Sequence, residues 1–128
     1  MAARILIADD EPHIRRLIEQ SLEELEEEGV SIHVAVNGEA ALDAIRSNRP
    51  DLVILDVMMP LMNGFEVCER VKKDEALRST FVILLTAKGQ EYDRRQGESV
   101  GADRYMTKPF DPDELVATAR KVLNLGAR

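Results

Sequence analysis

Almost uninterrupted apolar runs constrain this chain more than any other feature of its sequence. RILIA (4–8), DLVIL (51–55) and FVILL (81–85) are rich in β-branched residues and lack the alternation of a half-exposed strand. Such runs are typical of parallel strands that are covered on both faces. IHVAV (32–36) and, more weakly, DRYMT (103–107) indicate two further strands. We therefore expect a central sheet of five parallel strands.

Helical periodicity fills the segments between these runs. Apolar residues mark one face of four helices, namely Ile14, Leu17, Ile18, Leu22 and Leu25 in the first, Ala41, Ala44 and Ile45 in the second, Phe65, Cys68 and Val71 in the third, and Leu115, Val116, Ala119, Val122 and Leu123 in the last. A fifth, less amphipathic helical stretch spans 89–99, and Gly38 is expected in a loop. Strands that alternate with helices predict an α/β fold with right-handed crossovers, and we expect one domain over residues 1–128.

Charge and cysteine content limit the partners and the compartment. The chain has 24 acidic and 17 basic residues, a formal net charge of −7, which argues against nucleic acid or an anionic membrane as a direct partner. Cys68 is the only cysteine, which suits a reducing compartment, and we expect it to be a small core residue rather than a redox group. The apolar runs are too short for a signal peptide or a membrane span, so we expect a cytoplasmic protein.

Side chains that can do chemistry follow four of the expected strands. Asp9 and Asp10 come after the first, Asp56 after the third, Thr86 after the fourth and Lys108 after the fifth. Sites in open parallel sheets form beyond the carboxyl ends of the strands. Each residue has an ordinary alternative, since Asp10 or Asp56 could cap a helix, Thr86 could bond to the backbone, and Lys108 could be solvated. Four strand ends with complementary chemistry nevertheless favour one common site.

These residues belong to a set of motifs that resembles the receiver domain of bacterial two-component response regulators. The motifs are the pair Asp9–Asp10, DVMMPLMNG (56–64), LTA (85–87), GAD (101–103) and KPF (108–110), and the resemblance covers essentially all of the chain. It implies a flavodoxin-like, doubly wound fold with a five-stranded parallel sheet in the order 2-1-3-4-5 and five helices.

The resemblance implies a magnesium site at one rim of this sheet. In the implied strand order the first and third strands are neighbours, so Asp9, Asp10 and Asp56 converge, and three carboxylates repel unless a cation neutralises them. Oxygen ligands suit Mg²⁺. By resemblance Asp10, Asp56 and the backbone carbonyl of Met58 bind the ion directly, and Asp9 acts largely through water.

The resemblance also answers why a buried strand ends in Asp56, which it implies is the phosphoryl acceptor. A carboxylate can accept a phosphoryl group, and the transfer requires mainly positioning and charge stabilisation. Lys108 and the Thr86 hydroxyl are implied to contact the phosphoryl oxygens. The Lys108–Pro109 bond is a candidate cis peptide.

A switch follows from the same resemblance. The implied output surface comprises the helix at 89–99, the fifth strand and the last helix, switched through Thr86 and Tyr105. Met58 and Lys88 flank the site and are expected to set the lifetime of the phosphate. We expect self-catalysed phosphorylation with slow autodephosphorylation, so the protein is a switch and not an enzyme with turnover.

The implied partners are a sensor histidine kinase or a phosphotransfer protein, and either a downstream protein or an output domain beyond this sequence. We expect a monomer or a weak dimer. A phosphohydrolase of the haloacid-dehalogenase type is the enzyme alternative, but it needs a second aspartate where Met58 stands. A flavodoxin-like FMN binder would need a phosphate loop where this chain has DDEP (9–12), and a degenerate receiver would lack site residues that are all present here.

Overall fold

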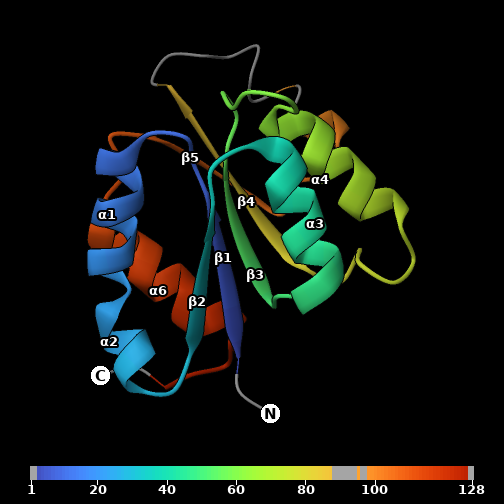
Figure 1. The fold of residues 1–128 in the computed structure, drawn as a ribbon. Helices are drawn as coiled ribbons and strands as arrows, with labels where there is room; N and C mark the ends of the chain where they lie inside the picture. Colours follow the sequence, from blue (N-terminus) through green and yellow to red (C-terminus); the bar gives the residue numbers. More distant parts are fainter. Residues whose placement is uncertain (1–2, 88–94, 96–97, 127–128) are drawn as a thin grey trace.

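The computed structural model describes residues 3–87, 95 and 98–126. Within them, five parallel strands form one sheet in the order β2-β1-β3-β4-β5, which confirms the expected flavodoxin-like order (Figure 1). The strands are β1 (Arg4–Ala8), β2 (Ser31–Ala35), β3 (Leu52–Asp56), β4 (Phe81–Ala87) and β5 (Arg104–Lys108). β1 and β3 are therefore neighbours, and their carboxyl ends open onto the same rim.

Helices cover both faces of this sheet. They are α1 (Pro12–Ser21), α2 (Glu23–Glu27), α3 (Gly38–Asn48), α4 (Gly64–Lys73) and α6 (Pro112–Val122). α1, α2 and α6 lie on one face and α3 and α4 on the other (Figure 1). The expected helix at 89–99 lies almost entirely outside the described residues. No helix in the described part of the chain is both long and apolar enough to cross a membrane.

Two hydrophobic cores explain the uninterrupted apolar runs. Ile5 and Ile7 of β1 pack on the side of α1 and α6, whereas Leu6 and Ala8 pack on the side of α3 and α4. Successive side chains of a strand point to opposite faces, so a strand covered on both faces needs apolar residues at every position. All five residues of β3 are buried, including its terminal carboxylate Asp56.

The first helix differs from its prediction. It is broken at Leu22, whose backbone leaves helical geometry between α1 and α2. Leu22 at the break and Leu25 in α2 are both fully buried. Leu17, expected in the core, is 42% exposed. It directly precedes the buried Ile18, and one residue turns a helix by about 100°, so the two side chains face different directions.

The second strand is also less buried than its composition indicated. It spans Ser31–Ala35 rather than 32–36, and Val34 and Val36 are 41% and 50% exposed. β2 is an edge strand that pairs with β1 alone in the described sheet, so it has less cover than the central strands.

Gly38 is the first residue of α3 rather than a loop residue. A Cβ atom at this position would lie 1.7 Å from the carbonyl oxygen of Met62, so no other residue fits. The Gly38 N–H donates to the Pro60 carbonyl at 3.3 Å. This close approach packs the start of α3 onto the loop between β3 and α4, which borders the rim of the sheet.

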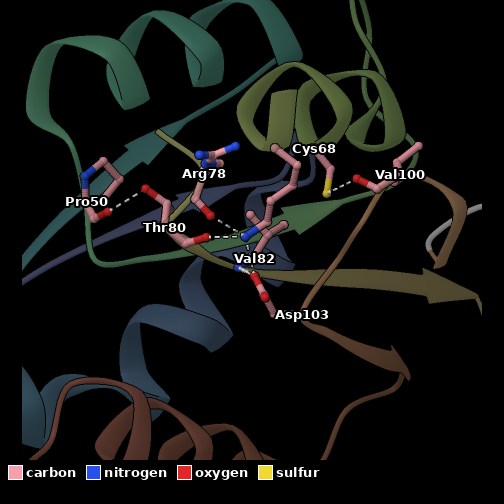
Figure 2. A network of polar contacts seen from close by, with 8 residues as sticks. Pro50, Cys68, Arg78, Thr80, Val82, Val100 and Asp103 are labelled. Carbon is pink, nitrogen blue, oxygen red and sulfur yellow. Dashed lines mark hydrogen bonds and ion pairs between the residues drawn. The ribbon is translucent and has the colours of Figure 1, made fainter. Parts of the chain in front are cut away.

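A polar network at the start of β4 joins α4 to the segment before β5. The Lys72 ammonium donates to the Thr80 and Arg78 carbonyls at 2.6 and 3.1 Å and lies 2.6 Å from Oδ2 of Asp103 (Figure 2). The same carboxylate oxygen accepts the Val82 N–H at 2.8 Å. The network joins these segments through Lys72, whose side chain is 15% exposed.

Cys68 confirms its expected place in the core, where it is fully buried. Burial raises the pKa of its thiol to about 12. The thiol donates to the Val100 carbonyl at 3.7 Å (Figure 2). A thiol with this pKa stays protonated near neutral pH and is a poor nucleophile, which fits a packing role.

Candidate functional site

The strand register brings the four predicted strand ends to one rim of the sheet. Asp9 directly follows β1, Asp56 ends β3 and Lys108 ends β5. Asp56 pairs with Leu85 of β4, so Thr86 lies one residue beyond it along the neighbouring strand. Residues separated by up to 99 positions in the sequence therefore meet at a single place.

Asp9, Asp10 and Asp56 form the acidic part of this site. One carboxylate oxygen from each lies within 4.8 Å of the others. Asp9 is fully buried, Asp56 is 5% exposed and Asp10 is exposed to solvent. Carboxylate oxygens are hard ligands, and the group faces solvent at Asp10. This fits Mg²⁺, which binds few protein carboxylates and keeps several bound waters. The structure thus provides a group of ligands that could hold such a cation.

Lys108 forms ion pairs with two of the three carboxylates. Its Nζ atom lies 3.1 Å from Oδ2 of Asp9 and 3.1 Å from Oδ1 of Asp56. Burial lowers the pKa of this ammonium, but the two carboxylates outweigh burial and raise the pKa above its ordinary value. Lys108 is therefore a permanent cation of the site. The peptide bond to Pro109 is cis, as the resemblance to receiver domains implied.

Asp56 has a raised pKa. Its Oδ1 atom accepts a hydrogen bond from the Met58 N–H at 3.2 Å. The same oxygen forms the ion pair with Lys108. Burial, followed by the charge of Asp9, raises the pKa of Asp56 from 3.8 to about 6, although Lys108 and the Met58 N–H act in the opposite direction. Near neutral pH the carboxylate is ionised, but it is held in an environment that disfavours its negative charge.

Thr86 contributes a buried hydroxyl to the site. The residue is 2% exposed, and its Oγ1 atom has no hydrogen-bond partner among the residues that the structure describes. Buried hydroxyls are almost always hydrogen-bonded, because an unmet bond costs about 1–3 kcal/mol. A free donor at the end of β4 therefore fits a site that binds an oxygen-rich group.

The ordinary alternatives for the two predicted ligands are wrong. The N-cap of α1 is Glu11 and not Asp10, and no side chain caps that helix end. The N-cap of α4 is Asn63, which forms a capping box with Glu66, so Asp56 caps no helix there. Neither carboxylate has a capping role in these helices that would explain its position.

Two contributors to the site were missed by the sequence reasoning. Arg15 donates from Nη1 to the Asp9 carbonyl at 2.8 Å. Its only signal was a cation one helical turn after an acidic loop. Gly64 packs so closely that a Cβ atom would lie 2.5 Å from the Asp56 carbonyl oxygen. Its place in the quoted motif did not reveal this contact.

The remaining predicted residues lie around this group. Met58 is 75% exposed in the loop after β3, so its side chain lies at the surface. Tyr105 of β5 is half-buried and packs against the core on the side of α3 and α4. Lys88 lies outside the described residues.

The fold and the site define a class: a doubly wound α/β protein with an acidic, lysine-containing site at the carboxyl ends of its parallel strands. Residues 5–120 match the model of the response regulator receiver domain. The chain belongs to this family of phosphorylation-activated switches in two-component signalling.

Individual proteins show the same relationship. The response regulator ArlR of Staphylococcus haemolyticus (strain JCSC1435) is 43% identical over 119 residues, which cover 93% of this chain and 52% of ArlR. The chain spans about half the length of the curated relatives it matches.

Solved structures of receiver domains have the same fold over almost their whole length. The chemotaxis response regulator CheY4 of Vibrio cholerae has a TM-score of 0.83 at 31% identity, covering 95% of this chain and 99% of CheY4. The signal receiver domain of a DNA-binding response regulator from Colwellia psychrerythraea 34H has a TM-score of 0.87 at 30% identity, covering 95% of this chain and 98% of that domain.

Proposed function

We propose that Asp56 accepts a phosphoryl group from a phosphohistidine of a sensor histidine kinase or of a phosphotransfer protein in a phosphorelay. A carboxylate oxygen of Asp56 attacks phosphorus, the P–N bond breaks, and the imidazole leaves with the bonding electrons and takes up a proton. The observation that carries this proposal is the buried Asp56 carboxylate, which is paired with Lys108 near the Thr86 hydroxyl. That hydroxyl has no hydrogen-bond partner in the part of the chain that the structure describes.

The acidic group is suited to hold Mg²⁺ during this transfer. We assign Asp10, Asp56 and the backbone carbonyl of Met58 as ligands, with Asp9 acting largely through water. When bound, the ion would neutralise negative charge on the phosphoryl oxygens. The proposal is supported by three carboxylate oxygens within 4.8 Å of one another. The pKa of Asp56 is raised first by burial and then by the charge of Asp9, and a bound cation would offset both effects.

The protein's own groups position the transferred phosphoryl. Lys108 remains protonated and is placed to pair with a phosphoryl oxygen, and the Thr86 hydroxyl is free to donate to another. Asp56 must be deprotonated to attack, which a pKa of about 6 allows at neutral pH. Preorganised donors of this kind stabilise the charge that spreads over the phosphoryl oxygens in the transition state.

The reaction makes the protein a switch that catalyses its own phosphorylation and, slowly, its own dephosphorylation. We assign control of the phosphate lifetime to Met58 and Lys88, because they flank the acceptor and Thr86 in the sequence. Met58 is 75% exposed beside Asp56, which supports a role at the approach of water.

The output surface is proposed to include the segment 89–99, which the sequence predicts to be helical, together with β5 and α6. Movement of the Thr86 hydroxyl towards the phosphoryl group would free space for Tyr105 to turn inward, which changes this surface. The partner that recognises the changed surface is a downstream protein or an output domain. This proposal is supported by the chain spanning about half the length of its curated relatives. We place the protein in the cytoplasm, as a monomer or weak dimer without direct contact to nucleic acid or membrane.

The experiment is phosphorylation by acetyl phosphate with Mg²⁺, followed by intact-protein mass spectrometry. Wild type is expected to gain one acid-labile phosphoryl group, and Asp56→Asn none. Asp43→Asn is the matched control, because it removes the same charge from an exposed position of α3. Undiminished labelling of Asp56→Asn would refute the assignment of the acceptor.

A further inference from the structure

We infer that Arg15 is a positioning residue of the metal site, which it orients through the backbone of Asp9. The guanidinium of Arg15 donates from Nη1 to the Asp9 carbonyl oxygen at 2.8 Å. This carbonyl belongs to the peptide unit that joins Asp9 to Asp10. Arg15 therefore holds the backbone from which the exposed ligand Asp10 projects, without itself lying among the three carboxylates.

Each polar group of Asp9 forms a hydrogen bond with a different residue. Its N–H donates to the Ala35 carbonyl at 3.2 Å, Oδ1 accepts the Glu11 N–H at 2.9 Å, and Oδ2 accepts Lys108 Nζ at 3.1 Å. The carbonyl is the fourth group, and it accepts a hydrogen bond from Arg15. The contact with Arg15 is thus the fourth point that fixes this turn.

The orientation of the Asp10 carboxylate depends on this turn more than the orientations of Asp9 and Asp56 do. Asp9 and Asp56 are buried and bonded to Lys108, whereas Asp10 is exposed and its carboxylate has no hydrogen bond within the described part of the chain. Its direction is therefore set by its backbone, which lies between the Asp9 carbonyl and the Glu11 N–H. Partners that orient a metal ligand typically change metal affinity by about 10–100-fold when they are removed.

The sign of the effect separates positioning from charge. Arg15 is a cation near a site that would bind a cation, so a purely electrostatic role predicts tighter Mg²⁺ binding when its charge is removed. Positioning predicts weaker binding, because Asp10 loses its fixed direction. Arg16 offers a matched control, since it is the next residue of α1, carries the same charge and is exposed. Its side chain makes no hydrogen bond to the described residues.

The test is titration calorimetry of the full chain with Mg²⁺ alone, well above the pKa of Asp56, on wild type, Arg15→Gln, Arg15→Lys and Arg16→Gln. Arg15→Gln is expected to bind Mg²⁺ about tenfold more weakly. Arg15→Lys, which retains a donor on a long side chain, should recover part of the affinity, and Arg16→Gln should bind as tightly as wild type or more tightly. The midpoint of urea unfolding without Mg²⁺ should be the same in all four proteins.

Two results would overturn the inference. One is Arg15→Gln binding Mg²⁺ as tightly as wild type or more tightly. The other is a loss of affinity in Arg15→Gln that Arg15→Lys does not recover and that comes with an equal loss of unfolding midpoint in both, which would indicate a structural role. The inference rests on the proposed function, but the two fail separately: if wild type itself binds no Mg²⁺, the proposed metal site is wrong, whatever the variants do.

Discussion

The Lys108 ammonium lies 3.1 Å from Oδ1 of Asp56, yet this ion pair does not return the pKa of Asp56 to its ordinary range. Burial and the charge of Asp9 outweigh the lysine, and the pKa rises to about 6. Lys108 is shared between two carboxylates, so it neutralises only part of their combined charge. Without a bound cation, the ionised site is therefore under net repulsion.

Stability without metal is expected to fall as the pH rises through the window from about 4 to about 6. Between the unfolded pKa of 3.8 and the folded pKa of about 6, the folded chain binds more protons than the unfolded chain, so raising the pH favours unfolding. Two pKa units correspond to a loss on the order of 3 kcal/mol. Asp56→Asn carries no such charge and should be the more stable protein above this window, and about equal to wild type below it.

Urea unfolding in the presence of a chelator, repeated across this window, measures the difference. Asp43→Asn, exposed on α3, controls for the general effect of one acidic charge. If wild type and Asp56→Asn keep the same difference in unfolding free energy at every pH, Asp56 does not carry the repulsion described above.

Two buried threonines should respond in opposite ways to the same substitution. Thr86→Val removes a hydroxyl that has no partner in the described residues, so the free energy of unfolding should stay equal or rise by about 1 kcal/mol. Thr80→Val removes the bond from Thr80 Oγ1 to the Pro50 carbonyl at 3.1 Å and should destabilise the fold by about 1–3 kcal/mol. Denaturant unfolding of both variants provides the comparison, and equal losses would contradict it.

The network at the start of β4 should make Lys72 far more important than its neighbour. Lys72→Met leaves two carbonyls and the Asp103 carboxylate without their shared donor and is expected to cost about 1–3 kcal/mol of unfolding free energy. Lys73 is the control, because its side chain is 76% exposed and forms only a 3.6 Å pair with Glu69. Its change to Met should stay within about 0.5 kcal/mol. Thermal or urea unfolding distinguishes the two, and a Lys72→Met protein as stable as wild type would show that water replaces the lysine.

Local sequence pattern was sufficient for the sheet and for the chemical identity of the strand ends. Strands covered on both faces require apolar residues at every position, so three strands were visible as uninterrupted runs. The side chains that follow parallel strands lie at one rim in any strand order, so a common site was predictable from the pattern. The order that makes the strands of Asp56, Thr86 and Lys108 neighbours was implied by the resemblance to receiver domains. The edge strand was less visible, because Val34 and Val36 are apolar but exposed.

Contacts between distant segments decided the rest. Two adjacent aspartates have the same side chain, but Asp9 is fully buried and Asp10 is exposed. Partners from β2, α1 and β5 hold Asp9, whereas the Asp10 carboxylate has no hydrogen bond to the described residues. Leu17 and Ile18 are likewise both apolar, and only the packing of α1 on the sheet determines which one is covered. By itself, the sequence determined which chemical groups follow each strand, because backbone periodicity is local. Burial, the raised pKa of Asp56 and the contact from Arg15 arise only in the tertiary structure, because each depends on atoms from several elements.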